Sequence, residues 1–132
     1  IKDLLVKDTK GQESDKKGGR GINVQEGAEL LLERGHVEGN RGNGIFIYGQ
    51  GTKADIKYLS IIKTERAECY ETSCKNRGSG SGISIPMGAD VKIENFRIED
   101  NFLVGLQIAR GLGKLSFKNG IITKNKFGIN YY

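Results

Sequence analysis

The chain has 132 residues, of which 36% are apolar and 20 are glycine, so it is long enough for one domain, covering residues 1–132. The formal net charge of +5 comes from 21 Lys and Arg residues against 16 Asp and Glu, a bias too modest to indicate a nucleic-acid-binding protein. No apolar run of about 18 residues occurs, which excludes a membrane-spanning helix.

After an apolar alternation within residues 1–9, the chain repeats a unit that starts with Gly-Ile-x-Ile or a close variant. The units start at Gly21, Gly44, Gly82, Gly105 and Gly128, which lie 23, 38, 23 and 23 residues apart. In the unit at Gly82, apolar and polar residues alternate over 83–85, 91–93 and 96–98, with Gly or Asn between these segments. This alternation is typical of short half-buried β-strands. A fixed period of this length predicts a solenoid with about 23 residues and three short strands per coil.

The repeat predicts four full coils and a partial coil at each end. Residues 1–9 align with residues 93–101, and residues 128–132 supply only a first strand. Two explanations of the partial coils remain open: the chain is a fragment of a longer solenoid, or it is a protomer whose copies stack head to tail through the open ends.

The motifs Gly82-Ile-Ser-Ile, Ile93-Glu-Asn-Phe-Arg-Ile-Glu-Asp-Asn and Gly105-Leu-Gln-Ile resemble the repeat of one known superfamily. They are similar to the right-handed parallel β-helix repeat of the pectate-lyase-like proteins, and in detail to NosD-type and myxobacterial secreted repeat proteins. The resemblance covers nearly the whole chain and implies an all-β, right-handed parallel β-helix. It does not specify a function, because lyases, hydrolases, adhesins and tailspikes share this architecture.

One corner of the predicted coils carries a repeated polar residue. Its members are Thr9, Asn40, Thr64, Asn101 and Asn125. Stacked Asn side chains can hydrogen-bond from coil to coil and satisfy backbone groups at the corner. We therefore interpret this set as a structural ladder.

Two insertions follow this corner, at residues 10–20 and 65–81, and both are rich in charge. Insertions in solenoids lie on one face, which is often the binding face. Their candidate binding residues are Lys16, Lys17, Arg20, Arg66 and Arg77.

The second insertion also contains the only two cysteines, Cys69 and Cys74. We expect them to form a disulfide, which predicts a secreted or cell-surface protein; free thiols in a cytosolic protein are the alternative. A zinc site would need more ligands than these two cysteines and the distant His36, so zinc is not indicated, and no metal or other cofactor is expected.

The outward positions of the first strands carry polar and aromatic residues. They are Asn23, Phe46, Ser84 and Gln107, with Tyr48 beside them. Such a row suits carbohydrate, and a plain polar strand face is the alternative interpretation. None of these residues is acidic, so this face offers no general acid or base for glycoside cleavage, and no catalytic residue is assigned.

Together these features predict a non-catalytic secreted or cell-surface module with a structural or binding role. Its partner would be a glycan or another copy of the chain. A polysaccharide lyase or hydrolase remains the alternative, with catalytic residues in the insertions or outside this sequence, so enzymatic activity stays open.

Overall fold

The computed structural model describes residues 1–14, 16–68, 80–109, 111 and 113–132, and these residues form ten β-strands. The strands are β1 (Lys2–Lys7), β2 (Ile22–Gln25), β3 (Glu29–Glu38), β4 (Asn43–Tyr48), β5 (Lys53–Ile62), β6 (Ser81–Met87), β7 (Asp90–Glu99), β8 (Val104–Ile108), β9 (Leu115–Thr123) and β10 (Phe127–Tyr131). Nothing in this described part of the chain forms a helix that is long and apolar enough to cross a membrane.

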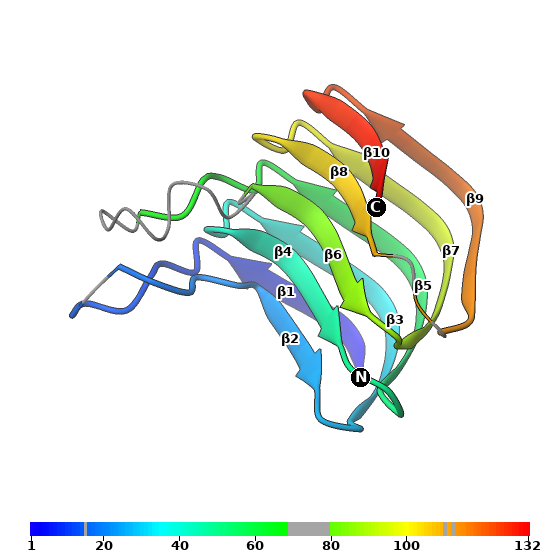
Figure 1. Ribbon diagram of the computed structural model, residues 1–132. Coiled ribbons are helices and arrows are strands. Elements are labelled where there is room, and N and C mark those ends of the chain that lie inside the picture. The colour runs from blue at the N-terminus through cyan, green and yellow to red at the C-terminus, as the bar shows by residue number, and fades with distance from the viewer. Residues whose placement is uncertain (15, 69–79, 110, 112) are drawn as a thin grey trace.

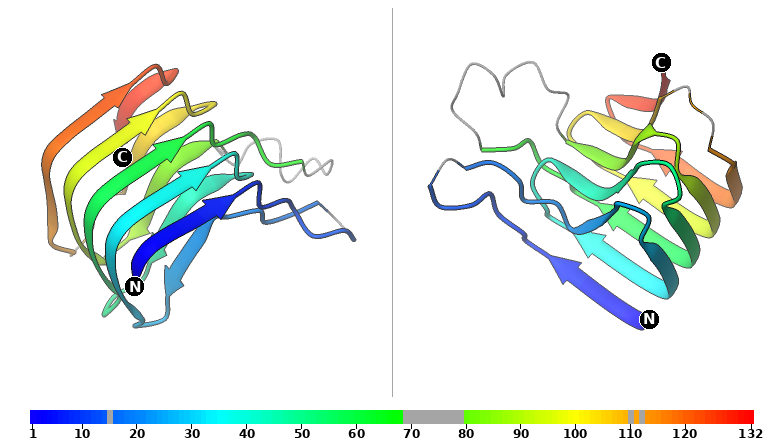
Figure 2. Two further views of the ribbon diagram at one scale, coloured as in Figure 1. Left: turned by 180° about the vertical axis from the view of Figure 1, so that it is seen from behind. Right: turned by 60° about the horizontal axis from the view of Figure 1, so that its bottom comes forward.

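The strands form two parallel sheets, and the chain passes from one sheet to the other at each step. The odd-numbered sheet has the order β1-β3-β5-β7-β9, and the even-numbered sheet has the order β10-β8-β6-β4-β2. Figure 1 shows the even-numbered strands stacked in chain order, and the left view of Figure 2 shows the other sheet from behind. The predicted all-β solenoid with parallel pairing between coils is therefore confirmed.

The strand count per coil differs from the prediction, because the expected second and third strands are one bent element. In β7 the two halves join at Asn95, whose φ of 57° lies in the left-handed region. The pairing of β5 with β7 runs through Lys57 and Glu94, omits Tyr58 and Asn95, and continues at Leu59 and Phe96. A single left-handed residue turns the chain without ending the ladder. The same position is left-handed in every odd-numbered strand, at Asp3, Arg34, Tyr58, Asn95 and Asn119.

The core is the space between the two sheets, and the opening motifs fill one side of it. Ile45, Ile83 and Leu106 pair in register across β4, β6 and β8 and are almost completely buried. From the opposite sheet Ile56 and Ile93 face them, both with no exposed surface. Burying one such side chain contributes about 1.5–3 kcal/mol, so these stacked aliphatic columns are the main source of stability.

Lack of space, and not backbone conformation, requires glycine at the start of four coils, at Gly21, Gly44, Gly82 and Gly105. A Cβ at Gly82 would lie 2.6 Å from Cγ2 of Ile98 and 2.7 Å from the carbonyl oxygen of Gly105 in the next coil. Gly44 has the same surroundings one coil earlier, and neither glycine has a positive φ. The glycine column thus allows neighbouring coils and the opposite sheet to approach closely.

The residues of the structural ladder make hydrogen bonds between coils. Asn101 Oδ1 accepts a hydrogen bond from the backbone N–H of Thr64 at 3.0 Å, and Asn125 Oδ1 accepts one from the N–H of Asn101 at 2.8 Å. At the start of the chain, Asn40 Oδ1 accepts from the N–H of Thr9 at 2.9 Å. Each amide therefore satisfies a corner N–H of the preceding coil, and Asn40, Thr64 and Asn101 are buried.

A group of three charged side chains beside this corner gives a prediction for acid titration. Arg97 and Lys124 both contact Glu99, and the hydrogen bond from Arg97, followed by that from Lys124, lowers the pKa of Glu99 from 4.5 to about 2. A carboxylate with a lowered pKa stabilises the fold above its ordinary pKa, and this contribution is lost as the pH falls from about 4.5 towards 2. We expect NMR titration to give a Glu99 midpoint near 2 in the wild type and a midpoint closer to 4.5 in Arg97→Gln. A wild-type midpoint at 4 or above would contradict the pairing.

Candidate functional site

The candidate site is the outer face of the even-numbered sheet, together with the insertion that reaches it. Register pairs Asn23 with Phe46, Phe46 with Ser84, and Ser84 with Gln107. The four outward residues predicted from the sequence therefore form one row across β2, β4, β6 and β8. The row runs along the stack, at the coil spacing of about 4.8 Å.

Arg20 brings a positive charge onto this row. Its guanidinium carbon lies 3.7 Å from the centroid of the Phe46 ring, and its Nη1 donates a hydrogen bond to Asn23 Oδ1 at 3.2 Å. A guanidinium over an aromatic face is attracted by the electrons of the ring. The ring covers one side of the otherwise exposed side chain, and this partial desolvation lowers the pKa of Arg20. The first insertion thus contributes to the sheet face through its last residue.

Phe46 and Tyr48 extend the row into an aromatic surface. They lie two residues apart on the same face of β4, with ring centroids 6.0 Å apart and ring planes 13° apart. Tyr48 is 40% exposed, and Phe46 is half-buried beneath Arg20. The two nearly parallel rings, with the Arg20 guanidinium over Phe46 and Asn23 hydrogen-bonded to it, place aromatic and hydrogen-bonding groups together on this face.

The end of the row on β6 and β8 is less exposed to solvent. Ser84, expected to be an exposed hydroxyl, is only 6% exposed. It projects from the outer face but lies in register between Phe46 and Gln107, whose longer side chains flank it. Gln107 Oε1 accepts a hydrogen bond from Ser81 Oγ at 3.2 Å. Ser84 therefore offers little surface to a ligand, Gln107 is half-buried, and the more continuous part of the row is Arg20, Asn23, Phe46 and Tyr48.

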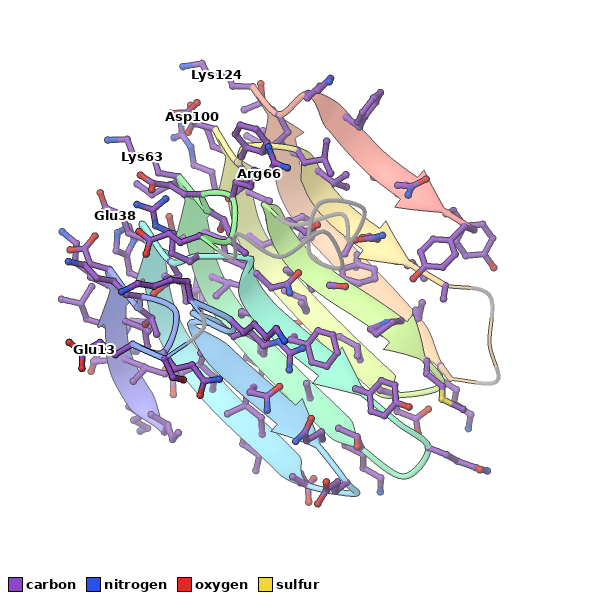
Figure 3. The ribbon with its side chains drawn as sticks, turned by 60° about the vertical axis from the view of Figure 1, so that its left-hand side comes forward. Glu13, Glu38, Lys63, Arg66, Asp100 and Lys124 are labelled. Carbon is purple, nitrogen blue, oxygen red and sulfur yellow. The ribbon has the colours of Figure 1, made fainter. Side chains whose placement is uncertain are left out.

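The remaining candidate binding residues lie away from this surface or outside the described residues. Lys16 is half-buried at a left-handed position of the first insertion, and Lys17 is exposed. Arg66 is exposed at the start of the second insertion, where Figure 3 labels it. Arg77, Cys69 and Cys74 fall within residues 69–79, outside the described residues. The disulfide therefore stays a prediction.

The corner beside the insertions carries charges that the sequence interpretation did not assign to a site. Figure 3 shows Glu38, Lys63, Asp100 and Lys124 projecting along this edge from successive coils. Lys63, Asp100 and Lys124 line a shallow depression of about 420 Å³, together with Phe102. Their signs alternate along the stack, so the edge has no continuous patch of one charge. It does not resemble a binding site for an ion of either sign.

The described part of the chain contains no cluster of three or more His, Cys, Asp and Glu side chains that could hold a metal ion. His36, the only histidine, lies on the outer face of β3 with its Nε2 3.1 Å from Oε2 of Glu38. Lys7 also contacts this carboxylate, and the hydrogen bond from His36 followed by that from Lys7 lowers the pKa of Glu38. This group is an open ion-pair network on a flat strand face.

Sequence reasoning missed Arg41, which the structure places between the two insertions. Its Nη1 lies 2.7 Å from Oε2 of Glu65, and its Nη2 lies 3.2 Å from Oε1 of Glu68. The only signal in the sequence is its position, directly after the ladder residue Asn40, in the coil between the two enlarged corners.

Comparison with known protein families gives one match. Residues 19–132 match the family model described as right handed beta helix region. A search of curated proteins and a search of solved structures gave no match.

Proposed function

Because the chain belongs to the family of proteins with a right handed beta helix region, we propose that its coils form a rigid, non-catalytic scaffold that binds carbohydrate on the outer face of the even-numbered sheet. The observation that carries the proposal is the arrangement of Arg20 over Phe46, with Asn23 and Tyr48 beside them. Asn23, Phe46 and Tyr48 come from strands whose positions are set by a buried core, and Arg20 comes from the end of the first insertion.

The chemistry of this surface suits a sugar ring. The apolar C–H face of a sugar packs on aromatic rings, and its hydroxyl groups require donors and acceptors at the ring edge. Tyr48 supplies an exposed ring, Phe46 supplies the half-buried ring beneath Arg20, and Asn23 supplies an amide. Arg20 uses Nη1 for Asn23, which leaves its other N–H groups for a ligand oxygen. A row of side chains across parallel strands favours an extended chain of sugars over a single enclosed one.

We further propose that the module acts at the cell surface or in secreted form. The support is the pair Cys69 and Cys74 in the second insertion, since a disulfide that closes a long surface loop forms in an oxidising compartment. Carbohydrate polymers are abundant in the same compartment.

Replacing Phe46 by Ala tests the proposed site. Loss of the central ring removes the stacking surface and the support of Arg20, so we expect roughly tenfold weaker retention on the polysaccharide that the wild type binds. The measurement is affinity electrophoresis or calorimetry with a panel of neutral and acidic polysaccharides. Phe102→Ala is the matched control, because Phe102 is an exposed Phe on another edge of the stack and should bind normally.

The same panel distinguishes the alternatives. Release of shortened or unsaturated sugars would replace the binding module by a lyase or hydrolase. Retention that is equal in Phe46→Ala and the wild type would move the site elsewhere on the molecule. No retention of the wild type on any member would refute carbohydrate binding as tested.

A further inference from the structure

Arg41 lies at the contact between the two insertions and binds the second one through its side chain. Its guanidinium pairs with Glu65 at 2.7 Å and with Glu68 at 3.2 Å, and its Nη1 donates to the carbonyl oxygen of Arg66 at 3.4 Å. The side chain of Arg41 is 30% exposed and that of Glu68 is 29% exposed, so part of the network is sheltered from water. A cation between two carboxylates also removes the repulsion that they would otherwise have.

The backbone of Arg41 binds the first insertion. Its N–H lies 3.0 Å from the carbonyl oxygen of Thr9 and 2.9 Å from that of Gly19, which are close to the two ends of the insertion. The Cβ of Arg41 also packs against Gly19, where an added Cβ would lie 2.5 Å from it. Gly19 has a φ of 85°, so the chain turns there immediately before Arg20. Arg41 thus contacts both insertions. Its contact with the first is at Gly19, directly before Arg20, whose guanidinium lies over Phe46.

We propose that Arg41 is a positioning residue, which couples the second insertion to the placement of Arg20 over Phe46. The side chain of Arg41 holds Glu65 and Glu68 of the second insertion, and its backbone N–H holds the carbonyl oxygens of Thr9 and Gly19 in the first. Gly19 in turn sets the direction in which Arg20 leaves the insertion. This inference rests on the proposed function only in that Arg20 belongs to the proposed carbohydrate site. Loss of the contacts between Arg41 and the second insertion would therefore alter the proposed carbohydrate site.

The test uses two readouts that need no ligand. Protons of Arg20 that lie over the Phe46 ring have NMR resonances shifted upfield by the ring, and this shift reports their placement. Trypsin cleavage after Lys10, Lys16, Lys17 and Arg20 reports opening of the first insertion, and cleavage after Arg66 reports opening of the second. Arg41→Ala keeps the Cβ and the backbone N–H but removes the contacts with Glu65 and Glu68. If those contacts position Arg20, the Arg20 shift should decrease and cleavage in both insertions should rise on the order of tenfold, while β-strand content is retained.

Two further variants separate positioning from a general loss of structure. The double variant Glu65→Gln and Glu68→Gln removes the ion pairs without touching Arg41, and it should reproduce the loss of the Arg20 shift. Arg34→Asn is the matched control. It removes an arginine that binds Asp3 and Glu33 in β1 and β3, and the left-handed position it occupies carries Asn in β7 and β9. Its Arg20 shift and cleavage rates should equal those of the wild type.

The outcomes are distinct from those of the binding experiment. An unchanged Arg20 shift in both Arg41→Ala and the Glu65/Glu68 variant would overturn the inference, whether or not carbohydrate binds. A lost shift together with a wild type that binds no polysaccharide would leave the coupling in place and refute only the proposed function. If carbohydrate does bind, Arg41→Ala alone should weaken binding several-fold. The double variant Arg20→Ala and Arg41→Ala should bind as weakly as Arg20→Ala alone.

Discussion

Replacing Ile56 by Asn is expected to unfold the chain, or to leave it without a cooperative unfolding transition. Ile56 has no exposed surface in β5, the central strand of its sheet, and it pairs in register with Leu32 and Ile93. The change removes a buried side chain and places an amide without partners among aliphatic groups, which together cost about 4 kcal/mol or more. A domain of this size has a total stability of about 5–15 kcal/mol, so the variant of a protein at the lower end of this range would retain little stability.

The neighbouring Lys57 provides the control, because Lys57→Asn introduces the same side chain on the exposed face of the same strand. Its effect should stay within about 0.5 kcal/mol. Urea unfolding followed by far-ultraviolet circular dichroism compares the two variants with the wild type. Equal midpoints for Ile56→Asn and Lys57→Asn would mean that the assignment of inward and outward positions in β5 is wrong.

The second large effect is expected for Gly82→Ala, although it adds only one methyl group. The new Cβ would lie 2.6 Å from Cγ2 of Ile98, 2.7 Å from the Gly105 carbonyl oxygen and 3.0 Å from Asn101 Nδ2. To relieve these contacts, the coil must move away from both the next coil and the opposite sheet, which weakens the hydrogen bonds of the ladder. We expect a loss of about 3 kcal/mol, at the upper end of the range for overpacked sites.

Gly128→Ala is the matched control for this prediction. Gly128 has the same place in the repeat and no positive φ, and a Cβ added there would have no atoms within 4 Å beyond its chain neighbours. Its thermal unfolding midpoint should equal that of the wild type. A destabilisation of Gly128→Ala as large as that of Gly82→Ala would point to backbone conformation, and not packing, as the reason for glycine at this position.

The parallel pairing and the core were predictable from the sequence because they depend on local periodicity. The spacing of Gly82 and Gly105 gives the coil length, and the alternation around Ile83 and Ile93 gives the buried face. The bend at Asn95 was interpreted as a boundary between two strands, because a left-handed residue interrupts the alternation. The sequence pattern does not show that the hydrogen-bonded ladder continues on both sides of it.

The candidate site was predictable only in part, since it depends on contacts between distant residues. The row of Phe46, Ser84 and Gln107 follows from the repeat. The burial of Ser84 depends on the size of its neighbours in adjacent coils, and the contact of Arg20 with Phe46 depends on the path of an insertion that has no repeat to define it. Arg41 follows a ladder residue, but the residue type at this position does not repeat from coil to coil, so its role is visible only once both insertions are placed around it.

The match between residue spacing and hydrogen-bond register has a consequence for how such a chain can change during evolution. Ser81 and Val104 are register partners, and each precedes the opening glycine of a coil. Loss of residues 82–104 would join Ser81 to Gly105 and bring the next coil into the same pairing, whereas loss of a single residue within a strand would turn every following side chain of that strand to the opposite face. Gene segments that encode one whole unit can therefore be duplicated or lost while the pairing of the remaining strands is preserved, and the length of the protein is expected to evolve in steps of one coil.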